Sequence, residues 1–263
     1  MVKKFSELLF SSWAEYKGNF KLIFKIFFIL YILPYLAVFL FSTYGLAEVN
    51  EKLSAIAATE GISATAAMGG IKEILLSALP SLTIYLVLIL ISAILGFIMS
   101  VTLVNFSFSL RGKQSKITTT SQAIKSASRY LGRYILLVIV VSLALSGLFL
   151  LFIIPAIIFY IYWIFGAYVL IGENKRIIES LRRSRLIVRG RWWRVLGYGL
   201  LLMLVFIAII IIFLIPGSIL GTLFQSTAIS NIFSLGAYLI IFPLGILFLK
   251  NFYLDLKANL RKK

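Results

Sequence analysis

The chain has 263 residues, of which 61% are hydrophobic, and its 26 Lys and Arg against 9 Asp and Glu give a net charge of +17. A soluble domain is usually just under half apolar, so this excess, with a mean hydropathy of +1.04, excludes a water-soluble globular fold. The sequence has no Cys and no His, which excludes disulfides and thiolate or imidazole metal sites. The basic residues cluster beside long apolar runs, so nucleic acid is not an expected partner.

The N-terminal segment predicts a helix at the membrane surface followed by a first membrane span. Phe5, Trp13 and Tyr16 recur at helical spacing among polar residues, as in an amphipathic helix resting in the headgroup plane. The apolar run 26–44 is close to the roughly 20 residues that cross a hydrocarbon core. The charged stretch ahead of it extends to Lys25 and is longer than a signal peptide requires, so we interpret the run as a retained helix.

Five more apolar runs follow in chain order. They predict membrane spans at 81–110, 134–154, 156–171, 193–215 and 232–249. Pro80 opens the second span, and Pro155 marks a tight turn between the third and the fourth. The fourth is the shortest, and a re-entrant segment is an alternative for it. A Pro-Gly pair at 216–217 ends the fifth span, and Pro243 interrupts the sixth.

The outer connections differ in character. Residues 46–79 form a long outer loop, rich in Ala, Ser, Thr and Gly at 55–70, for which disorder and a short interfacial helix at 71–79 are both open interpretations. The outer turn after the fifth span holds Gly217 and Gly221, whose spacing matches a helix-packing pattern of small residues. Their place at a turn favours a simple bend instead.

Charges in the connections predict the orientation. Basic residues outnumber acidic ones in 111–133, in 173–194 and in the tail, whereas acids outnumber bases in the outer loop and the other two turns are uncharged. Because Lys and Arg favour cytoplasmic loops, this alternation predicts that both termini are cytoplasmic. The expected location is the plasma membrane of a prokaryote, in which the chain is multi-pass.

Three cytoplasmic segments share a short pattern of Ser, five residues, Gly, Asn or Arg, and an aromatic, and its glycines are Gly18, Gly132 and Gly190. We interpret them as hinges where an interfacial helix turns into the membrane, through a C-cap or a kink. The expected fold is an all-α integral membrane protein with about six transmembrane helices as three hairpins, each preceded by a cytoplasmic interfacial amphipathic helix. The chain would form a single membrane domain, 1–263, with repeat-like units 1–116, 117–173 and 174–263.

Catalytic chemistry is not expected. The interiors of the predicted spans contain no Asp, Glu, Lys, Arg or His, the residue types on which proton-coupled transport and ion pumping generally depend. Serines within the spans have no strong base to activate them as nucleophiles. We therefore assign no catalytic, cofactor-binding or metal-ligating residue and expect neither a cofactor nor enzymatic activity.

The segment before the fifth span is the most basic part of the chain. Its candidate contacts for lipid headgroups or a partner protein are Arg182, Arg183, Arg185, Arg189, Arg191 and Arg194. Near an anionic surface each basic residue adds about 1 kcal/mol of binding. The same charges hold the loop in the cytoplasm, which we take as their main role. The expected partners are membrane lipids, including anionic ones, and a protein on the cytoplasmic face.

The stretch 179–197, ESLRRSRLIVRGRWWRVLG, resembles the segment before the penultimate helix in a broad group of uncharacterised prokaryotic polytopic membrane proteins. This group is related to the membrane domain of glycerophosphoryl diester phosphodiesterases. The opening 12–20 and the closing 252–257 are similar to it as well. In the enzyme-linked members of this group, hydrolysis belongs to a separate soluble barrel that uses histidines. The resemblance therefore implies a similar membrane module without the catalytic domain.

Two functions are consistent with this sequence. The first is a non-enzymatic membrane module that organises lipids or partner proteins through its interfacial helices. The alternative is a permease or channel subunit of a transport complex, whose basic cytoplasmic helices couple to a partner such as a separate ATPase. A lipid-modifying enzyme is disfavoured because acid–base residues are missing from the spans.

Overall fold

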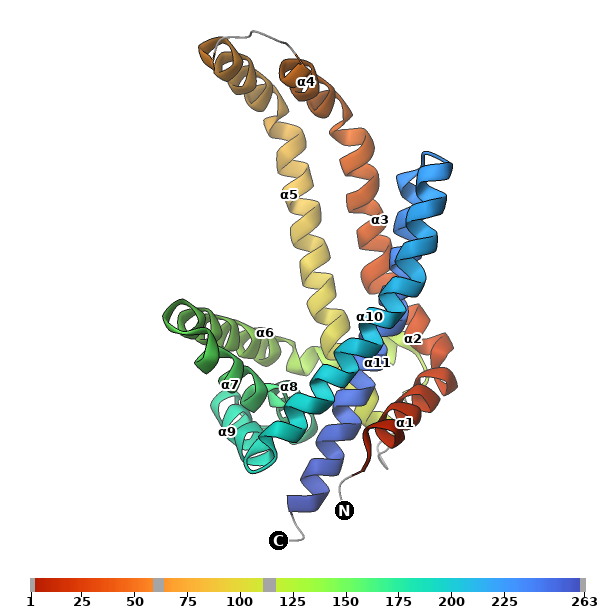
Figure 1. Cartoon of the computed structure of the whole chain (residues 1–263), viewed down its shortest axis with the longest axis vertical. Helices are drawn as coiled ribbons and strands as arrows, with labels where there is room; N and C mark the ends of the chain where they lie inside the picture. The colour runs from red at the N-terminus through yellow and green to blue at the C-terminus, as the bar shows by residue number, and fades with distance from the viewer. Residues whose placement is uncertain (1–2, 59–63, 111–116, 261–263) are drawn as a thin grey trace. The chain divides into compact units, whose positions relative to one another are not determined.

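The computed structural model describes residues 3–58, 64–110 and 117–260, and every regular element within them is helical. Six helical stretches are long and apolar enough to cross a membrane, which confirms the expected all-helical architecture with six candidate spans. These are Phe20–Gly45, Met68–Ser109, Thr120–Leu151, Ile153–Gly172, Trp192–Leu223 and Thr227–Leu260. Figure 1 shows the course of the chain.

The chain packs as two compact units. We call residues 27–97 the small unit, and residues 1–26 together with 98–263 the large unit. This division differs from the three repeat-like units that the sequence pattern indicates, and those stay a prediction.

The small unit begins with a helix that changes its winding twice. It begins at the last residue of α2 (Phe20–Phe27) and continues as the π-helical turn η1 (Phe28–Ile32), α3 (Leu33–Leu40), the π-helical turn η2 (Phe41–Gly45) and α4 (Ala47–Ala58). Pro34 lies in the first turn of α3. A proline ring clashes with the carbonyl four residues before it, and the wider turn of η1 just ahead of Pro34 relieves that clash.

The small unit also contains the first part of α5 (Ala64–Ser109), a helix that continues through Pro80. The prediction that this span opens after Pro80 is therefore wrong, and much of the outer loop 46–79 is helical in α4 and α5. Its alanine content explains this, because Ala has the highest helix propensity. The Ser92 hydroxyl of α5 donates to the Pro34 carbonyl of α3 over 3.4 Å, so these two helices are in contact within the small unit.

The large unit is built around short, buried segments in the second half of the chain. Its elements are α1 (Phe5–Gly18), α2 up to residue 26, the end of α5, α6 (Thr120–Leu151), α7 (Ile153–Trp163), α8 (Gly166–Gly172), α9 (Ile177–Val188), α10 (Trp192–Leu223) and α11 (Thr227–Leu260). Helix α8 contributes Val169 to the core, where it packs with Phe165, Ile187, Phe252 and Tyr253. Helices α10 and α11 pack along each other, and α1 packs on α11 (Figure 1).

Close packing of α10 against α11 corrects a second expectation. Helix α10 does not end at residues 216–217 but continues to Leu223, with Gly217 and Gly221 both buried. The Ser230 hydroxyl of α11 donates to the Gly217 carbonyl over 3.0 Å. A Cβ atom on Gly217 would lie 2.7 Å from the Cβ of Phe233. The small residues thus let two helices approach closely, and the predicted bend is wrong.

The three predicted hinge glycines lie in different backbone settings. Gly18 is the last residue of α1, and Asn19 alone separates α1 from α2. Gly190 has a φ of 78° and forms the turn between α9 and α10, a conformation that favours glycine. Gly132 lies inside α6, which is helical on both sides of it. One helix therefore ends and another begins near Gly18 and near Gly190, whereas the chain stays in a single helix at Gly132.

Candidate functional site

Helix α9 is attached to the large unit through a buried face. Ser180, Leu181, Ser184, Ile187 and Val188 are buried on this face. The Ser184 hydroxyl donates to the Tyr162 carbonyl over 2.7 Å and accepts from the Phe165 amide over 3.2 Å. These bonds satisfy backbone groups where α7 ends and α8 begins, which are otherwise left without intrahelical partners. The orientation of α9 is therefore determined by the helix break beside it.

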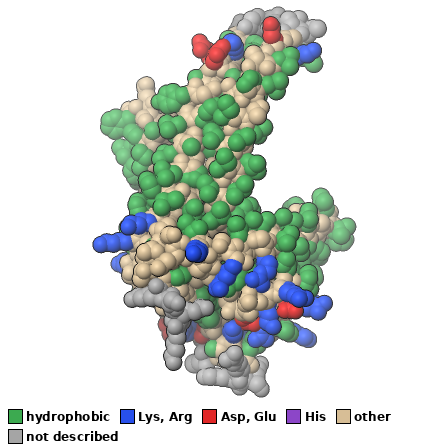
Figure 2. Space-filling view, turned by 180° about the vertical axis from the view of Figure 1, so that it is seen from behind, with side chains coloured by type: hydrophobic (Ala, Val, Ile, Leu, Met, Phe, Trp, Pro, Cys, Tyr) green, Lys and Arg blue, Asp and Glu red, His purple; other side chains and the backbone are tan. Residues whose placement is uncertain are grey.

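The opposite face of α9 mixes arginine with exposed apolar side chains. Ile178, Arg182, Arg185, Leu186 and Arg189 recur at helical spacing and are exposed, and we call them the α9 stripe. Ile178 and Leu186 are 55% and 51% exposed. An exposed stripe of alternating cationic and apolar side chains suits the boundary between headgroups and acyl chains better than water. In Figure 2, Lys and Arg side chains gather at one end of the large unit.

The six candidate arginines divide into two groups. Arg183 lies 3.5 Å from the Glu173 carboxylate, and Arg191 donates to the Leu256 and Asn259 carbonyls over 3.0 and 3.1 Å. Arg191 thereby caps the end of α11, whose last carbonyls have no intrahelical donor. These two arginines have structural partners, which the sequence pattern does not distinguish from the rest.

The other four arginines face outward. The guanidinium of Arg185 lies 5.5 Å from the centre of the Tyr162 ring, a cation–π contact. Arg182, Arg189 and Arg194 are exposed, and their guanidinium groups form no hydrogen bond or ion pair with any residue that the structure describes. Beside them, the Trp193 side chain is 79% exposed. The structure thus brings four free or weakly held cations and one exposed indole to the α9–α10 corner.

Glu173 joins the connection before α9 to the end of α11. Its carboxylate accepts from the Tyr253 hydroxyl over 2.8 Å and lies 3.0 Å from the Lys257 ammonium. Partial burial acts to raise the pKa of Glu173, but hydrogen bonds from Tyr253 and Lys257 and the charges of Lys257 and Arg183 outweigh it and hold the pKa below its ordinary value. The carboxylate therefore stays ionised and stabilises this corner.

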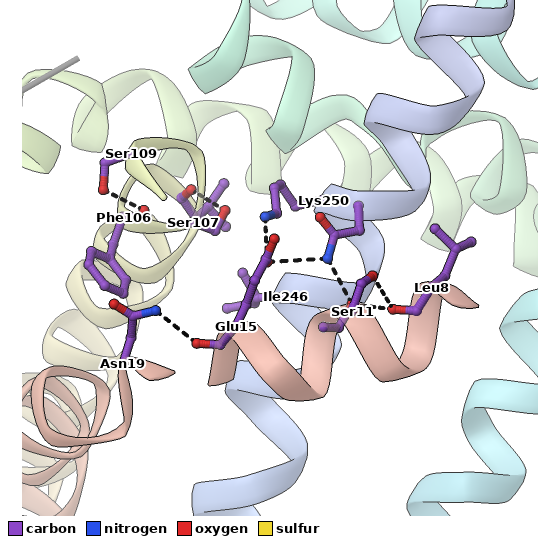
Figure 3. A network of polar contacts seen from close by, with 12 residues as sticks. Leu8, Ser11, Glu15, Asn19, Phe106, Ser107, Ser109, Ile246 and Lys250 are labelled. Atoms are coloured by element: carbon purple, nitrogen blue, oxygen red, sulfur yellow. Dashed lines mark hydrogen bonds and ion pairs between the residues drawn. The ribbon is translucent and has the colours of Figure 1, made fainter. Parts of the chain in front are cut away.

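A second polar cluster, absent from the sequence prediction, joins the first helix to the last. The Lys250 side chain of α11 is 0% exposed, and its ammonium lies 2.6 Å from the Glu15 carboxylate of α1. The Asn251 amide donates to the Glu15 carboxylate over 3.2 Å and to the Ser12 hydroxyl over 2.9 Å. Figure 3 shows Glu15 extending from α1 toward Lys250, beside the end of α5 at Ser107. We call Ser12, Glu15, Lys250 and Asn251 the α1–α11 cluster.

The sequence prediction put Lys250 in the cytoplasmic tail, just beyond the sixth span. The structure shows that α11 continues to Leu260 and buries Lys250 completely, whereas its cytoplasmic location stays a prediction. In a sequence, a lysine after an apolar run usually indicates the end of a span. The partner of Lys250 is Glu15, which lies 235 residues away and cannot be recognised from the sequence near Lys250. The one available signal was Glu15 itself, an acid within a segment dominated by lysine.

One atom of the α1–α11 cluster has an unsatisfied hydrogen-bonding capacity. The Asn251 side-chain oxygen is buried and accepts no hydrogen bond from the described part of the chain. A buried acceptor without a donor costs about 1–3 kcal/mol, so such atoms in native structures call for an explanation. Within the same described residues, no group of three or more acidic side chains gathers where it could hold a metal ion.

Comparison with known proteins gives no relative from which a function could be transferred. No family model matches the chain, no curated protein matches it, and no solved structure matches it. Its function must therefore be argued from the α9–α10 corner and the α1–α11 cluster.

Proposed function

We propose that this chain is a non-enzymatic, multi-pass protein of a prokaryotic plasma membrane that organises anionic lipids along its cytoplasmic face. The observation that carries the proposal is the α9 stripe, where outward arginines alternate with exposed Ile178 and Leu186. Anionic headgroups attract basic residues, while the adjacent apolar side chains are compatible with the upper acyl region. The resemblance to phosphodiesterase membrane domains belongs to the same proposal, as a module without a catalytic part.

The proposed arrangement in the membrane follows the charges. Helices α1 and α9 and the first half of α6 lie in the cytoplasmic headgroup plane, and each is followed by a hairpin. Both termini are then cytoplasmic, and α4 lies outside. The alternation of basic and non-basic connections supports this arrangement.

The orientation can be measured directly because the sequence contains no cysteine. We expect Asn50→Cys to react with a membrane-impermeant maleimide in intact cells, and Ser128→Cys to react only after the membrane is permeabilised. Both side chains are exposed, so a missing signal will reflect the membrane rather than burial. Labelling of both positions from the same side would refute the arrangement.

The lipid function is tested by removing the three outward arginines whose side chains have no partner among the described residues. We expect Arg182→Gln, Arg189→Gln and Arg194→Gln together to abolish enrichment of phosphatidylglycerol over phosphatidylcholine around the protein in mixed nanodiscs. Each arginine contributes about 1 kcal/mol near an anionic surface, less where salt screens it. The measurement is mass spectrometry of co-purified lipid at low and high salt.

A matched variant removes three exposed lysines elsewhere on the predicted cytoplasmic side, Lys21→Gln, Lys125→Gln and Lys175→Gln. It loses the same charge and is expected to keep most of the enrichment. An equal loss in both variants would mean that total charge, and not the α9 stripe, attracts the lipid.

The second candidate is a permease or channel subunit, and the α1–α11 cluster favours it. An ionisable side chain buried between apolar helices often marks a substrate or ion pathway. Lys250 is fully buried where α1 packs on α11, and the neighbouring Asn251 side-chain oxygen accepts no hydrogen bond from the described residues. Co-purification of an ATPase bound to the basic cytoplasmic helices would support this function over the first.

A further inference from the structure

An apolar groove lies between α7 and α10, next to the α9 stripe. Its volume is about 500 Å³, within the range of roughly 300–1,000 Å³ typical of ligand sites. The groove is lined by Ile154, Ile157, Ile158, Tyr162, Trp192 and Trp193. Its walls are therefore aliphatic along α7 and aromatic where α10 begins.

The aromatic end of the groove carries a positive charge. Tyr162 lines the groove, and the guanidinium of Arg185 lies 5.5 Å from the centre of its ring. The Ser184–Tyr162 hydrogen bond holds α9 at this end of α7, which keeps the backbone of Arg185 beside the groove. Trp192 and Trp193 form an edge-to-face pair at 4.7 Å on the opposite wall. Aromatic and cationic side chains together are typical of the headgroup level of a bilayer.

The length of the groove corresponds to one leaflet. From Ile154 to Tyr162, α7 rises by about 12 Å at 1.5 Å per residue. Half of a hydrocarbon core is roughly 15 Å. In the proposed orientation α9 and the start of α10 lie at the cytoplasmic interface, so the end of the groove at Tyr162, Trp192 and Trp193 lies near the headgroups.

We propose that this groove binds one acyl chain of an anionic phospholipid of the cytoplasmic leaflet, with its phosphate on Arg185. The inference rests on the proposed orientation and lipid function, and it adds a defined site to them. Charge complementarity selects the occupant, because a guanidinium at the end of an apolar groove matches a phosphate attached to an acyl chain. An apolar helix of a partner protein would fill the walls but leave Arg185 without an anion.

Tryptophan quenching can test the site in the full-length protein. Trp13→Phe and Trp163→Phe leave Trp192 and Trp193 as the only tryptophans, and both line the groove. In nanodiscs of phosphatidylcholine, a small fraction of phosphatidylglycerol with brominated acyl chains should quench these indoles more than the same fraction of brominated phosphatidylcholine.

Two arginine variants separate the groove from the general surface. We expect Arg185→Gln to reduce the preference for brominated phosphatidylglycerol about fivefold, the effect of one basic residue at an anionic surface. Arg185→Lys should retain most of it, which also controls for folding. Lys175→Gln, an exposed lysine just before the same helix and outside the α9 stripe, removes the same charge and should change quenching little.

Each contrary outcome has a distinct meaning. Equal effects of Arg185→Gln and Lys175→Gln would overturn the groove site, whereas lipid binding by the α9 stripe is tested separately by the variant that removes three arginines. Equal quenching by the two brominated lipids would overturn the anionic specificity. No quenching by either lipid would mean that another occupant, such as a partner helix, fills the groove. If the unmodified protein showed no enrichment of phosphatidylglycerol in nanodiscs, the proposed function itself would be overturned.

Discussion

Lys250→Met is expected to destabilise the protein by about 3 kcal/mol, near the lower end of the 3–5 kcal/mol lost when one partner of a buried ion pair is removed. Lys250 is fully buried, whereas the Glu15 side chain is 17% exposed and keeps some access to solvent. The variant leaves the Glu15 carboxylate without the ammonium that balances its charge. Unfolding in detergent micelles, followed by tryptophan fluorescence, measures the loss.

The double variant Glu15→Gln with Lys250→Met should recover most of this stability, because neither charge then remains buried. Lys257→Met serves as a control: Lys257 is 23% exposed, and its partner Glu173 also contacts Arg183 and Tyr253. We expect a smaller loss there. If Lys250→Met and the double variant were equally unstable, the ion pair would not account for the effect.

The double variant also separates the two candidate functions. A module that organises lipid through the α9 stripe should retain its lipid enrichment when the α1–α11 cluster is replaced by neutral side chains. A transport subunit that uses Lys250 in its pathway should fold but lose transport. The stable double variant is therefore more informative than either single variant.

Gly217→Val is the substitution expected to disrupt the α10–α11 contact most clearly. A Cβ at this position would lie 2.7 Å from the Cβ of Phe233, an atom attached directly to the backbone of α11. Overpacking of this kind costs about 1–3 kcal/mol, because the helices must move apart. Thermal unfolding in detergent should show the loss.

Gly199→Val is its matched control on the same helix. A Cβ on Gly199 meets no described atom within 4 Å, so the same side chain is added where space is open. We expect this variant to unfold close to the unmodified protein. Equal destabilisation by both variants would show that valine perturbs α10 itself and that the close approach to α11 contributes little.

The sequence by itself determined the positions of the apolar helices. Six runs of sufficient length and hydropathy identify six candidate spans, because hydrophobicity and length are local properties of the chain. It also located the corner where arginines and tryptophans meet, since those residues are neighbours in sequence. Helix ends were less predictable: prolines at 80 and 216 look like boundaries, yet α5 and α10 continue through them.

Only the tertiary structure decided which polar residues have partners. Lys250 and Arg191 look like ordinary basic residues beside a span, but one pairs with Glu15 and the other caps α11. Gly217 looks like a bend until Phe233 is found against it. Each of these roles depends on a neighbour distant in sequence or on another helix, and composition and spacing contain no information about such contacts. Hydrocarbon solvation can be read along the chain, whereas charge pairing and close packing arise only when the helices meet.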